Sequence, residues 1–149
     1  MDALDRKILT VLQANARASL QEVGQAVGLS TSPCWERIRK LEAAGVIEGY
    51  TVRLNAQALG LNDTVLVQVT LDSHSDNTLE KFGETLAAIP EVVEAYLVSG
   101  EYDYLLRVMV KDTRDYERLL RERLYKIKGI RHSKSSFVLR TLKKADLPL

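Results

Sequence analysis

Polar and charged side chains recur on one side of residues 30–45, where Cys34, Ile38 and Leu41 are spaced as one face of a helix. Serine and threonine at the start of this segment are good N-caps, and Pro33 is tolerated in a first helical turn. The outward face and its flanks hold Ser32, Trp35, Glu36, Arg37, Arg39 and Lys40. Arginine can bind guanine through two hydrogen bonds, glutamate can accept one from cytosine, and serine or lysine can hold a phosphate. The pattern therefore indicates a helix that could read the major groove of DNA.

The residues before this helix supply the rest of a helix-turn-helix. Apolar residues recur at helical spacing up to Asn15, and a second helix follows with Ser19 as its N-cap. The inward residues of the second helix are predicted to be Leu20, Val23 and Val27. Gly28 ends it, because a left-handed residue after a helix is most easily glycine. Gly24 has no side chain and so allows the close helix approach that this motif needs.

The same periodicity is also typical of an ordinary three-helix bundle with a solvated charged face, in which Trp35 is a core residue. If the segment binds DNA, Thr31 and Ser32 add a phosphate site, because they lie at the N-terminus of the helix. Cys34 is expected to be a small core residue of that helix. Periodicity alone leaves the two interpretations open.

A second group of residues that could do chemistry lies in a predicted hairpin: Ser99, Gly100, Glu101, Tyr102, Asp103 and Tyr104. Glycine in a tight turn lets a backbone approach a ligand closely. A carboxylate, two tyrosines and exposed backbone amides within a few residues can bind an amino group and a carboxyl group together. The simpler interpretation is a plain hairpin whose acidic residues keep a sheet edge soluble.

The elements that must position this hairpin alternate between strands and helices. Residues 46–54 are predicted as a strand and residues 55–62 as a linker, and the apolar period then changes to two. Strands are predicted from Asp63, at 92–99, at 106–110 and at 136–142, with helices over 79–89 and from Asp112 or Thr113 to Gly129. The order β-α-β-β-α-β is the ferredoxin-like arrangement, an α+β fold with both helices on one face of an antiparallel sheet. The bare face carries apolar residues, Val69 or Leu105 depending on register, and such a surface argues for an oligomer.

The composition narrows the class of protein. The chain has 149 residues, and 21 Lys and Arg against 20 Asp and Glu give a net charge of +1, so any basic footprint must be local. The single cysteine excludes an intramolecular disulfide and a multi-thiolate zinc site. His74 and His132 have no second ligand at metal spacing and are expected to be surface residues. Neither a secretion signal nor an apolar run of roughly 20 residues is visible, so a cytoplasmic protein is expected.

Five segments of the sequence resemble the leucine-responsive regulator and asparagine-regulator (Lrp/AsnC) family, the feast/famine transcription factors. They are residues 4–9 (LDRKIL), 27–30 (VGLS), 33–38 (PCWERI), 41–50 (LEAAGVIEGY) and 98–106 (VSGEYDYLL). The similarity covers nearly the whole chain. It implies a winged helix-turn-helix DNA-binding domain over residues 1–54, a linker over 55–62, and a ferredoxin-like effector-binding and oligomerisation domain over 63–149.

The resemblance also implies a ligand and an assembly. In that family dimers join through their sheets and assemble into octamers, and an effector pocket lies between dimers around the turn from Gly100 to Asp103. The turn and the following Leu105 and Leu106 resemble the leucine-type branch, which favours free leucine or methionine as the effector. Ser135 and Ser136 are expected to border this pocket. No other cofactor and no metal is implied.

Three functions compete on this sequence. The first is a transcriptional regulator that binds double-stranded DNA and responds to an amino acid. The second is a small enzyme, but no nucleophile with a base and no paired carboxylates stand at a suggestive spacing. The third is an effector-binding module without DNA function, against which the complete helix-turn-helix argues. The charged run at 114–123 interleaves acids with bases and is expected to be a solvated face rather than a second nucleic-acid site.

Overall fold

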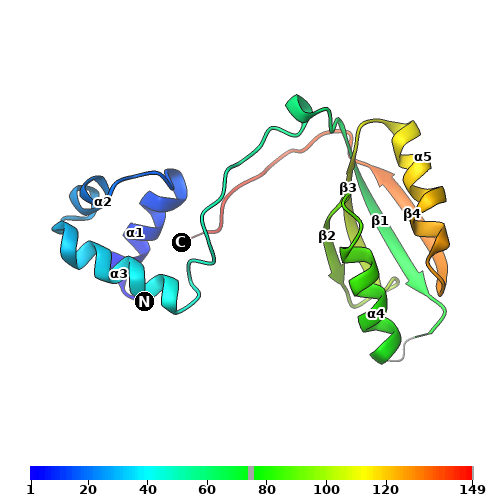
Figure 1. Ribbon diagram of the computed structural model, residues 1–149, viewed down its shortest axis with the longest axis horizontal. Helices are drawn as coiled ribbons and strands as arrows, with labels where there is room; N and C mark the ends of the chain where they lie inside the picture. Colours follow the sequence, from blue (N-terminus) through cyan, green and yellow to red (C-terminus); the bar gives the residue numbers. More distant parts are fainter. Residues whose placement is uncertain (74–75, 149) are drawn as a thin grey trace. The chain divides into compact units, whose positions relative to one another are not determined.

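The computed structural model describes residues 1–73 and 76–148. Its elements form two compact units (Figure 1), Met1–Leu54 with the C-terminal segment that begins at Lys143, and Asn55–Leu142. Each unit has a hydrophobic core of its own. His74 lies outside the described residues, whereas His132 is exposed, as predicted.

The C-terminal segment differs from the predicted division of the chain, which placed it with the sheet. Gln13 Nε2 donates to the Leu147 carbonyl oxygen at 3.1 Å, and Arg53 pairs with Asp146 at 3.6 Å. These contacts group the segment with the helical unit. The sequence gives no sign of this, because the contacts join residues that are far apart in the chain and mostly polar.

The helical unit contains α1 (Ala3–Ala14), α2 (Leu20–Val27) and α3 (Thr31–Ala43). At the start of α2 the Ser19 side chain accepts from the Glu22 N–H, and the Glu22 carboxylate accepts from the Ser19 N–H. Asp2 and Asp5 make the equivalent exchange at the start of α1. These capping boxes satisfy backbone N–H groups that the first turn of a helix leaves without partners. The N-cap predicted at Ser19 is therefore confirmed.

The turn between α2 and α3 depends on two glycines. Gly28 ends α2 with a φ of 76°, as predicted. A β-carbon on Gly24 would lie 2.6 Å from the Leu29 carbonyl oxygen, so this glycine makes room for the turn itself. The core beneath consists of Ile8, Leu9, Val23, Val27, Cys34, Ile38 and Leu41. Cys34 is fully buried there, which confirms it as a core residue.

The strand predicted for residues 46–54 is wrong. This segment forms no strand in the structure and pairs with none of the four strands of the sheet. Val52 is 73% exposed and Leu54 is 69% exposed. Alternating apolar residues favour a strand only where a neighbouring strand can take up the backbone hydrogen bonds. The described part of this chain therefore lacks the wing that the resemblance implied.

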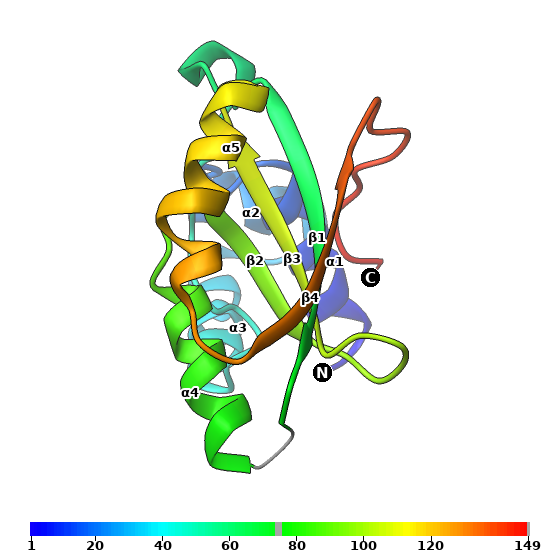
Figure 2. The same ribbon diagram turned by 90° about the vertical axis from the view of Figure 1, so that its right-hand side faces the viewer.

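The sheet unit has the predicted ferredoxin-like order. Its elements are β1 (Asp63–Leu71), α4 (Asp76–Ala87), β2 (Val92–Leu97), β3 (Tyr104–Val110), α5 (Thr113–Glu122) and β4 (Ile130–Phe137). The strands lie in the order β2-β3-β1-β4, and every neighbouring pair is antiparallel. Figure 2 shows α4 and α5 on one face of the sheet. The α+β class and its topology are thus confirmed.

Two boundaries near the C-terminus of this unit were predicted wrongly. The last helix ends at Glu122 and not at Gly129, and a short 3₁₀ turn, Leu124–Lys126, follows it. The last strand covers Ile130–Phe137 and not 136–142. Its position is set by β1, because pairing begins at Leu71 with Ile130 and ends near Asp63, where β1 itself begins. The apolar pattern of the sequence does not report this register.

The register of the sheet decides which residues face the helices. Val69 pairs with Tyr104, and both are buried under α4 and α5. Leu105 pairs with Gln68 and therefore belongs to the bare face, because successive side chains of a strand alternate. The helix-covered core contains Val65, Val67, Val69, Leu71, Phe82, Leu86, Ile89, Tyr104, Leu106, Val108, Val110, Tyr116, Leu119 and Leu124. Of the two predicted candidates for the bare face, Leu105 is the one that lies there.

Candidate DNA-binding helix and ligand-binding hairpin

The outward face of α3 is polar, exposed and anchored from below. Cys34, Ile38 and Leu41 hold the helix to the core of its unit. The exposed residues of the opposite side include Thr31, Ser32, Trp35, Glu36, Arg39 and Lys40. Such a helix keeps one face in the core and leaves the other free for a DNA groove, as the helix-turn-helix requires.

Trp35 belongs to this exposed face. Its side chain is 50% exposed, so the alternative in which it fills the core does not hold. The Arg39 guanidinium carbon lies 5.6 Å from the centroid of the Trp35 ring, within the range of a cation–π contact. That contact restricts the Arg39 side chain and presents its charge on the outward side of the helix.

Arg37 differs from the other cations of α3. Its Nη1 atom lies 2.7 Å from a carboxylate oxygen of Asp2 and 2.7 Å from one of Asp5. The pKa of each aspartate is lowered, first by the backbone N–H of the other aspartate and then by Arg37. The carboxylates raise the pKa of Arg37 in return. This side chain therefore fastens α3 to the start of α1 and does not share the exposed basic face.

Leu20 lies at the surface, although its helical spacing with Val23 and Val27 predicts a core position. It is 37% exposed, and it borders a shallow hollow of about 420 Å³ together with Thr31, Ser32, Trp35 and Glu36. Leu20 is the first residue of α2, where the apolar stripe has not yet reached the core. Its position brings an apolar side chain to the same surface as the polar face of α3. Helical spacing alone could not show this, because spacing does not reveal where the neighbouring helix ends.

The hairpin residues 98–103 connect β2 to β3, and Asp103 ties them to β1. The Asp103 N–H donates to the Val69 carbonyl oxygen at 2.9 Å, and its carboxylate accepts from the Leu71 N–H at 2.7 Å. Gly100 has a φ of +143°, and a β-carbon there would meet nothing within 4 Å. The glycine is therefore needed for the backbone angle of the turn, not for space within this chain.

The remaining hairpin residues present both side chains and amides. Ser99 and Glu101 are exposed, and Tyr102 is half-buried. Within the described part of the chain, the backbone N–H groups of residues 99–102 make no hydrogen bond, whereas that of Val98 donates to the Asp103 carbonyl oxygen. The turn thus offers several donors together with two carboxylates, those of Glu101 and Asp103.

The structure does not bring Ser135 and Ser136 next to this turn. Ser135 pairs with Val67 and shares a hydroxyl hydrogen bond with Tyr116 on the helix side of the sheet. Ser136 is the next residue along β4 and therefore faces the opposite side. The β4 residue that pairs with Val69, beside Asp103, is Ser133. Ser135 and Ser136 were named on the family resemblance, for a pocket between copies of the chain, and within one chain the register of β4 brings Ser133 nearest to the hairpin. Their contact with an effector stays a prediction.

Comparison with known proteins finds one family model for the helix-turn-helix and one for the sheet unit, and the second model also covers residues 143–148, which the contacts group with the helical unit. Residues 1–42 match the model of the AsnC-type helix-turn-helix domain, and residues 64–148 match that of the Lrp/AsnC ligand binding domain. The leucine-responsive regulatory protein of Escherichia coli (strain K12) is 38% identical over 146 residues, which cover 98% of this chain and 89% of that protein.

Two solved structures are similar over 99% of this chain. The AsnC family transcriptional regulator from Agrobacterium tumefaciens is 41% identical, with a TM-score of 0.94 over 97% of its own chain. A transcriptional regulator from Neisseria meningitidis in complex with L-methionine is 32% identical, with a TM-score of 0.93 over 96% of its own chain.

A helix-turn-helix unit with an exposed polar helix, followed by a ferredoxin-like ligand-binding domain, defines a ligand-responsive transcriptional regulator. The chain belongs to the Lrp/AsnC family of such regulators. The Escherichia coli relative is a regulatory protein, and the Agrobacterium tumefaciens relative is a transcriptional regulator. No helix in the described ranges is long and apolar enough to cross a membrane. Those ranges also contain no cluster of three or more histidine, cysteine or acidic side chains that could hold a metal ion.

Proposed function

We propose that this regulator binds a specific DNA sequence through α3 and that a free amino acid with an apolar side chain, of the leucine or methionine type, modulates its activity. The observation that carries the proposal is the exposed face of α3, in a chain similar over its whole length to a regulator solved with L-methionine. The amino acid binds at the turn between β2 and β3. The protein acts in the cytoplasm, where the DNA and the free amino acids are.

DNA recognition uses the side chains that α3 leaves exposed. Arg39, held against Trp35, is suited to guanine, and Glu36 can accept a hydrogen bond from cytosine. Thr31, Ser32 and Lys40 are suited to phosphate, because the first two lie at a helix N-terminus and the third is a flexible cation. Arg37 supports this face indirectly, since its two ion pairs fix α3 to α1.

The turn between β2 and β3 matches the chemistry of a zwitterion. An amino acid needs an acceptor for its ammonium group and donors for its carboxylate. Asp103 supplies a carboxylate, and the amides at Ser99, Gly100 and Glu101 supply donors. The bond from the Leu71 N–H does not prevent this role, because each carboxylate oxygen has two lone pairs.

A second copy of the chain is needed to enclose the amino acid, because the turn is an open surface. The bare face of the sheet offers the means of association: Leu66, Tyr96, Leu105 and Met109 lie on it beside the ion pair of Arg107 with Glu94. We place the dimer interface on this face and the amino acid between dimers that assemble further, up to an octamer. Ser135 and Ser136 border the amino acid in this arrangement only if they belong to a neighbouring copy.

Two titrations on the full chain test the proposal. In a gel-shift series with the DNA upstream of the protein's own gene, affinity should fall steeply as salt is raised, because cations on α3 replace condensed counterions. Calorimetric titration of leucine and of methionine should give saturable heat, and D-methionine should give less. Binding that is insensitive to salt would remove α3 from the DNA site. Absence of heat with all twenty amino acids would remove the effector.

A further inference from the structure

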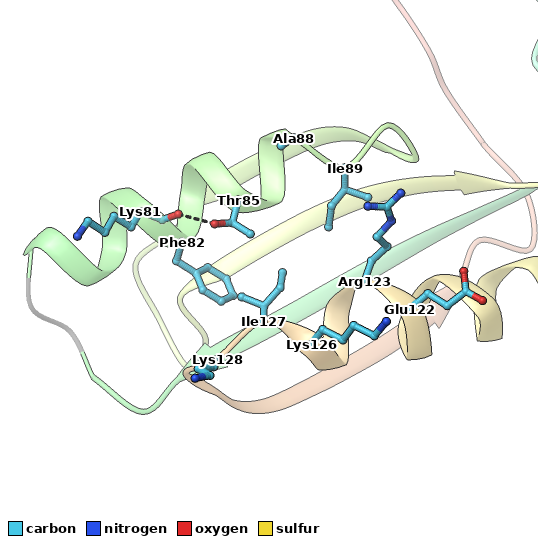
Figure 3. Close-up of a pocket in the computed structure, with 10 residues that line it drawn as sticks. All are labelled: Lys81, Phe82, Thr85, Ala88, Ile89, Glu122, Arg123, Lys126, Ile127 and Lys128. Carbon is cyan, nitrogen blue, oxygen red and sulfur yellow. Dashed lines mark hydrogen bonds between the residues drawn. The ribbon is translucent and has the colours of Figure 1, made fainter.

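A groove between the two outer helices of the sheet unit carries charge that neither the DNA face nor the hairpin uses (Figure 3). It lies between the C-terminal half of α4 and the end of α5, and its volume is about 700 Å³. Four cations line it, Lys81, Arg123, Lys126 and Lys128, together with one acid, Glu122. The groove is therefore strongly positive for a chain whose net charge is only +1.

The charge of this groove is not neutralised locally. None of the four cations makes an ion pair with another residue in the described ranges. Glu122 is paired outside the groove, at 3.6 Å from Arg118 and 3.6 Å from Arg121. Four like charges around one hollow repel each other, and a bound anion would relieve that repulsion.

The floor of the groove is apolar. Phe82 and Ile89 are 4% and 6% exposed, and Ile127 is half-buried. Figure 3 shows Phe82 and Ile127 together in the middle of the groove, with Arg123 beside Ile89. The lining therefore favours a ligand that combines negative charge with an apolar body.

We propose that this groove binds a small molecule in which a polyphosphate is joined to a flat ring system, the class of nucleoside di- and triphosphates. Four unpaired cations suit several negative charges, whereas a simple carboxylate needs only one partner. The apolar floor selects against inorganic phosphate, which would leave it uncovered. The volume is in the range of small-molecule sites, about 300–1,000 Å³.

The positions of the four cations favour a bound ligand over a role in which they only complement the charge at helix ends. Cations often follow the last turn of a helix, where they complement the partial negative charge of its carbonyl groups. That role accounts for Arg123 and Lys126 after α5. It does not account for Lys81, which lies in the middle of α4, or for Lys128, which lies beyond the 3₁₀ turn.

The test is calorimetric titration of the full chain with ATP and GTP in a buffer without divalent cations. Tripolyphosphate carries the charge alone and adenosine carries the ring alone, and each should bind at least about tenfold more weakly than ATP. The double variant Arg123→Ala, Lys126→Ala should lose at least about tenfold in ATP affinity. A matched double variant, Lys111→Ala, Arg114→Ala, removes two exposed cations near the start of α5 and should bind ATP as the wild type does.

Three results would overturn this site. One is no heat with either nucleotide, and the second is tripolyphosphate binding as tightly as ATP. The third is an unchanged ATP affinity in the groove variant. A titration with duplex DNA tests the alternative that these cations bind DNA. If the groove variant loses DNA affinity and the wild type binds no nucleotide, the groove is part of the DNA-binding surface. Methionine binding is measured in parallel and stands or falls separately, because its residues lie at the hairpin.

Discussion

The outward face of α3 and the hairpin between β2 and β3, the two proposed binding surfaces, are built in different ways. The face of α3 is complete within one chain, because three buried residues of the same helix and the Arg37 ion pairs hold it in place. The hairpin is incomplete: the Asp103 carboxylate is bonded to β1, the backbone donors lie open, and within one chain the serines expected beside it lie elsewhere on the sheet.

Under the proposed function, the difference reflects the size of the ligand that each surface would bind. DNA is larger than the protein unit, so one exposed helix on a firm core is sufficient to meet it. A free amino acid is small, and a site recognises its polar groups and its side chain only when it encloses most of the molecule. The first surface therefore depends on packing inside its own unit, whereas the proposed amino-acid site would need a neighbouring copy to enclose it.

The largest effect is expected from a methyl group on Gly24, which lies in α2 and faces the turn before α3. Gly24→Ala would place a β-carbon 2.6 Å from the Leu29 carbonyl oxygen, and backbone cannot move aside cheaply. We expect the helical unit to lose about 3 kcal/mol of its free energy of unfolding, the upper part of the range for overpacking. DNA affinity should fall with it, as measured by urea denaturation followed by gel shift.

A matched glycine in the sheet unit provides the control. In Gly83→Ala, the nearest atom to the new β-carbon is the Tyr104 hydroxyl oxygen at 3.8 Å, an ordinary contact. Because alanine is the better helix former, this variant should be unchanged or about 0.5–1 kcal/mol more stable. Equal destabilisation by both substitutions would show that the turn before α3 is not the constraint described above.

The second effect concerns the DNA face itself. Arg39→Ala should weaken operator binding by about 1–3 kcal/mol if the guanidinium reads a base. The fold should be unaffected, because Arg39 is exposed and contacts only Trp35 among the described aromatic rings. Fluorescence anisotropy on the upstream DNA measures the change, with Lys7→Ala on exposed α1 surface as the control. Unchanged affinity in both Arg39→Ala and Lys40→Ala would show that this face of α3 does not bind the DNA.

The elements that could be predicted from sequence are those that local rules determine. Ser19 and Gly28 mark the ends of α2 because capping and left-handed turns use few residue types, and Cys34, Ile38 and Leu41 mark one helix face by spacing. The ferredoxin-like order followed from the change of apolar period. These features need no knowledge of distant partners.

The predictions that failed depend on partners far along the chain. Residues 46–54 alternate like a strand, but no strand lies beside them. The position of β4 is set by its pairing with β1, so the last strand covers Ile130–Phe137 and not 136–142. Within one chain this register leaves Ser135 and Ser136 away from the hairpin, and their role beside an effector stays a prediction. Arg37 was predicted to flank the outward face, and spacing does not show that Asp2 and Asp5 lie within its reach. Its contact with DNA stays a prediction.

The third effect tests the hairpin. Asp103→Asn keeps an oxygen that can accept from the Leu71 N–H but removes the charge that an ammonium group needs. We expect methionine and leucine to bind at least about tenfold more weakly, which is about 1.4 kcal/mol. DNA affinity without the amino acid should be unchanged.

Asp72→Asn, an exposed neighbour at the end of β1, is the control. Equal calorimetric affinity in wild type and Asp103→Asn would remove Asp103 from the amino-acid site.

The smallest effect concerns the ion pairs that hold α3 to α1. The pKa values of Asp2 and Asp5 are lowered from 3.8 in the folded chain, so the stability they provide is present above that value and lost as pH falls through the lower folded pKa values. The thermal midpoint of the helical unit should therefore drop on acidification below about pH 4.

Arg37→Ala should reduce this dependence without abolishing it, because the reciprocal backbone N–H bonds are the larger cause of both pKa shifts. Its operator affinity should fall less than that of Arg39→Ala, since the Arg37 side chain is held by its two ion pairs to the start of α1. Arg17→Ala, an exposed cation on the same unit, should follow the wild-type acid profile. A loss of DNA affinity in Arg37→Ala equal to that in Arg39→Ala, with the acid profile unchanged, would make Arg37 a DNA contact and not a link between helices.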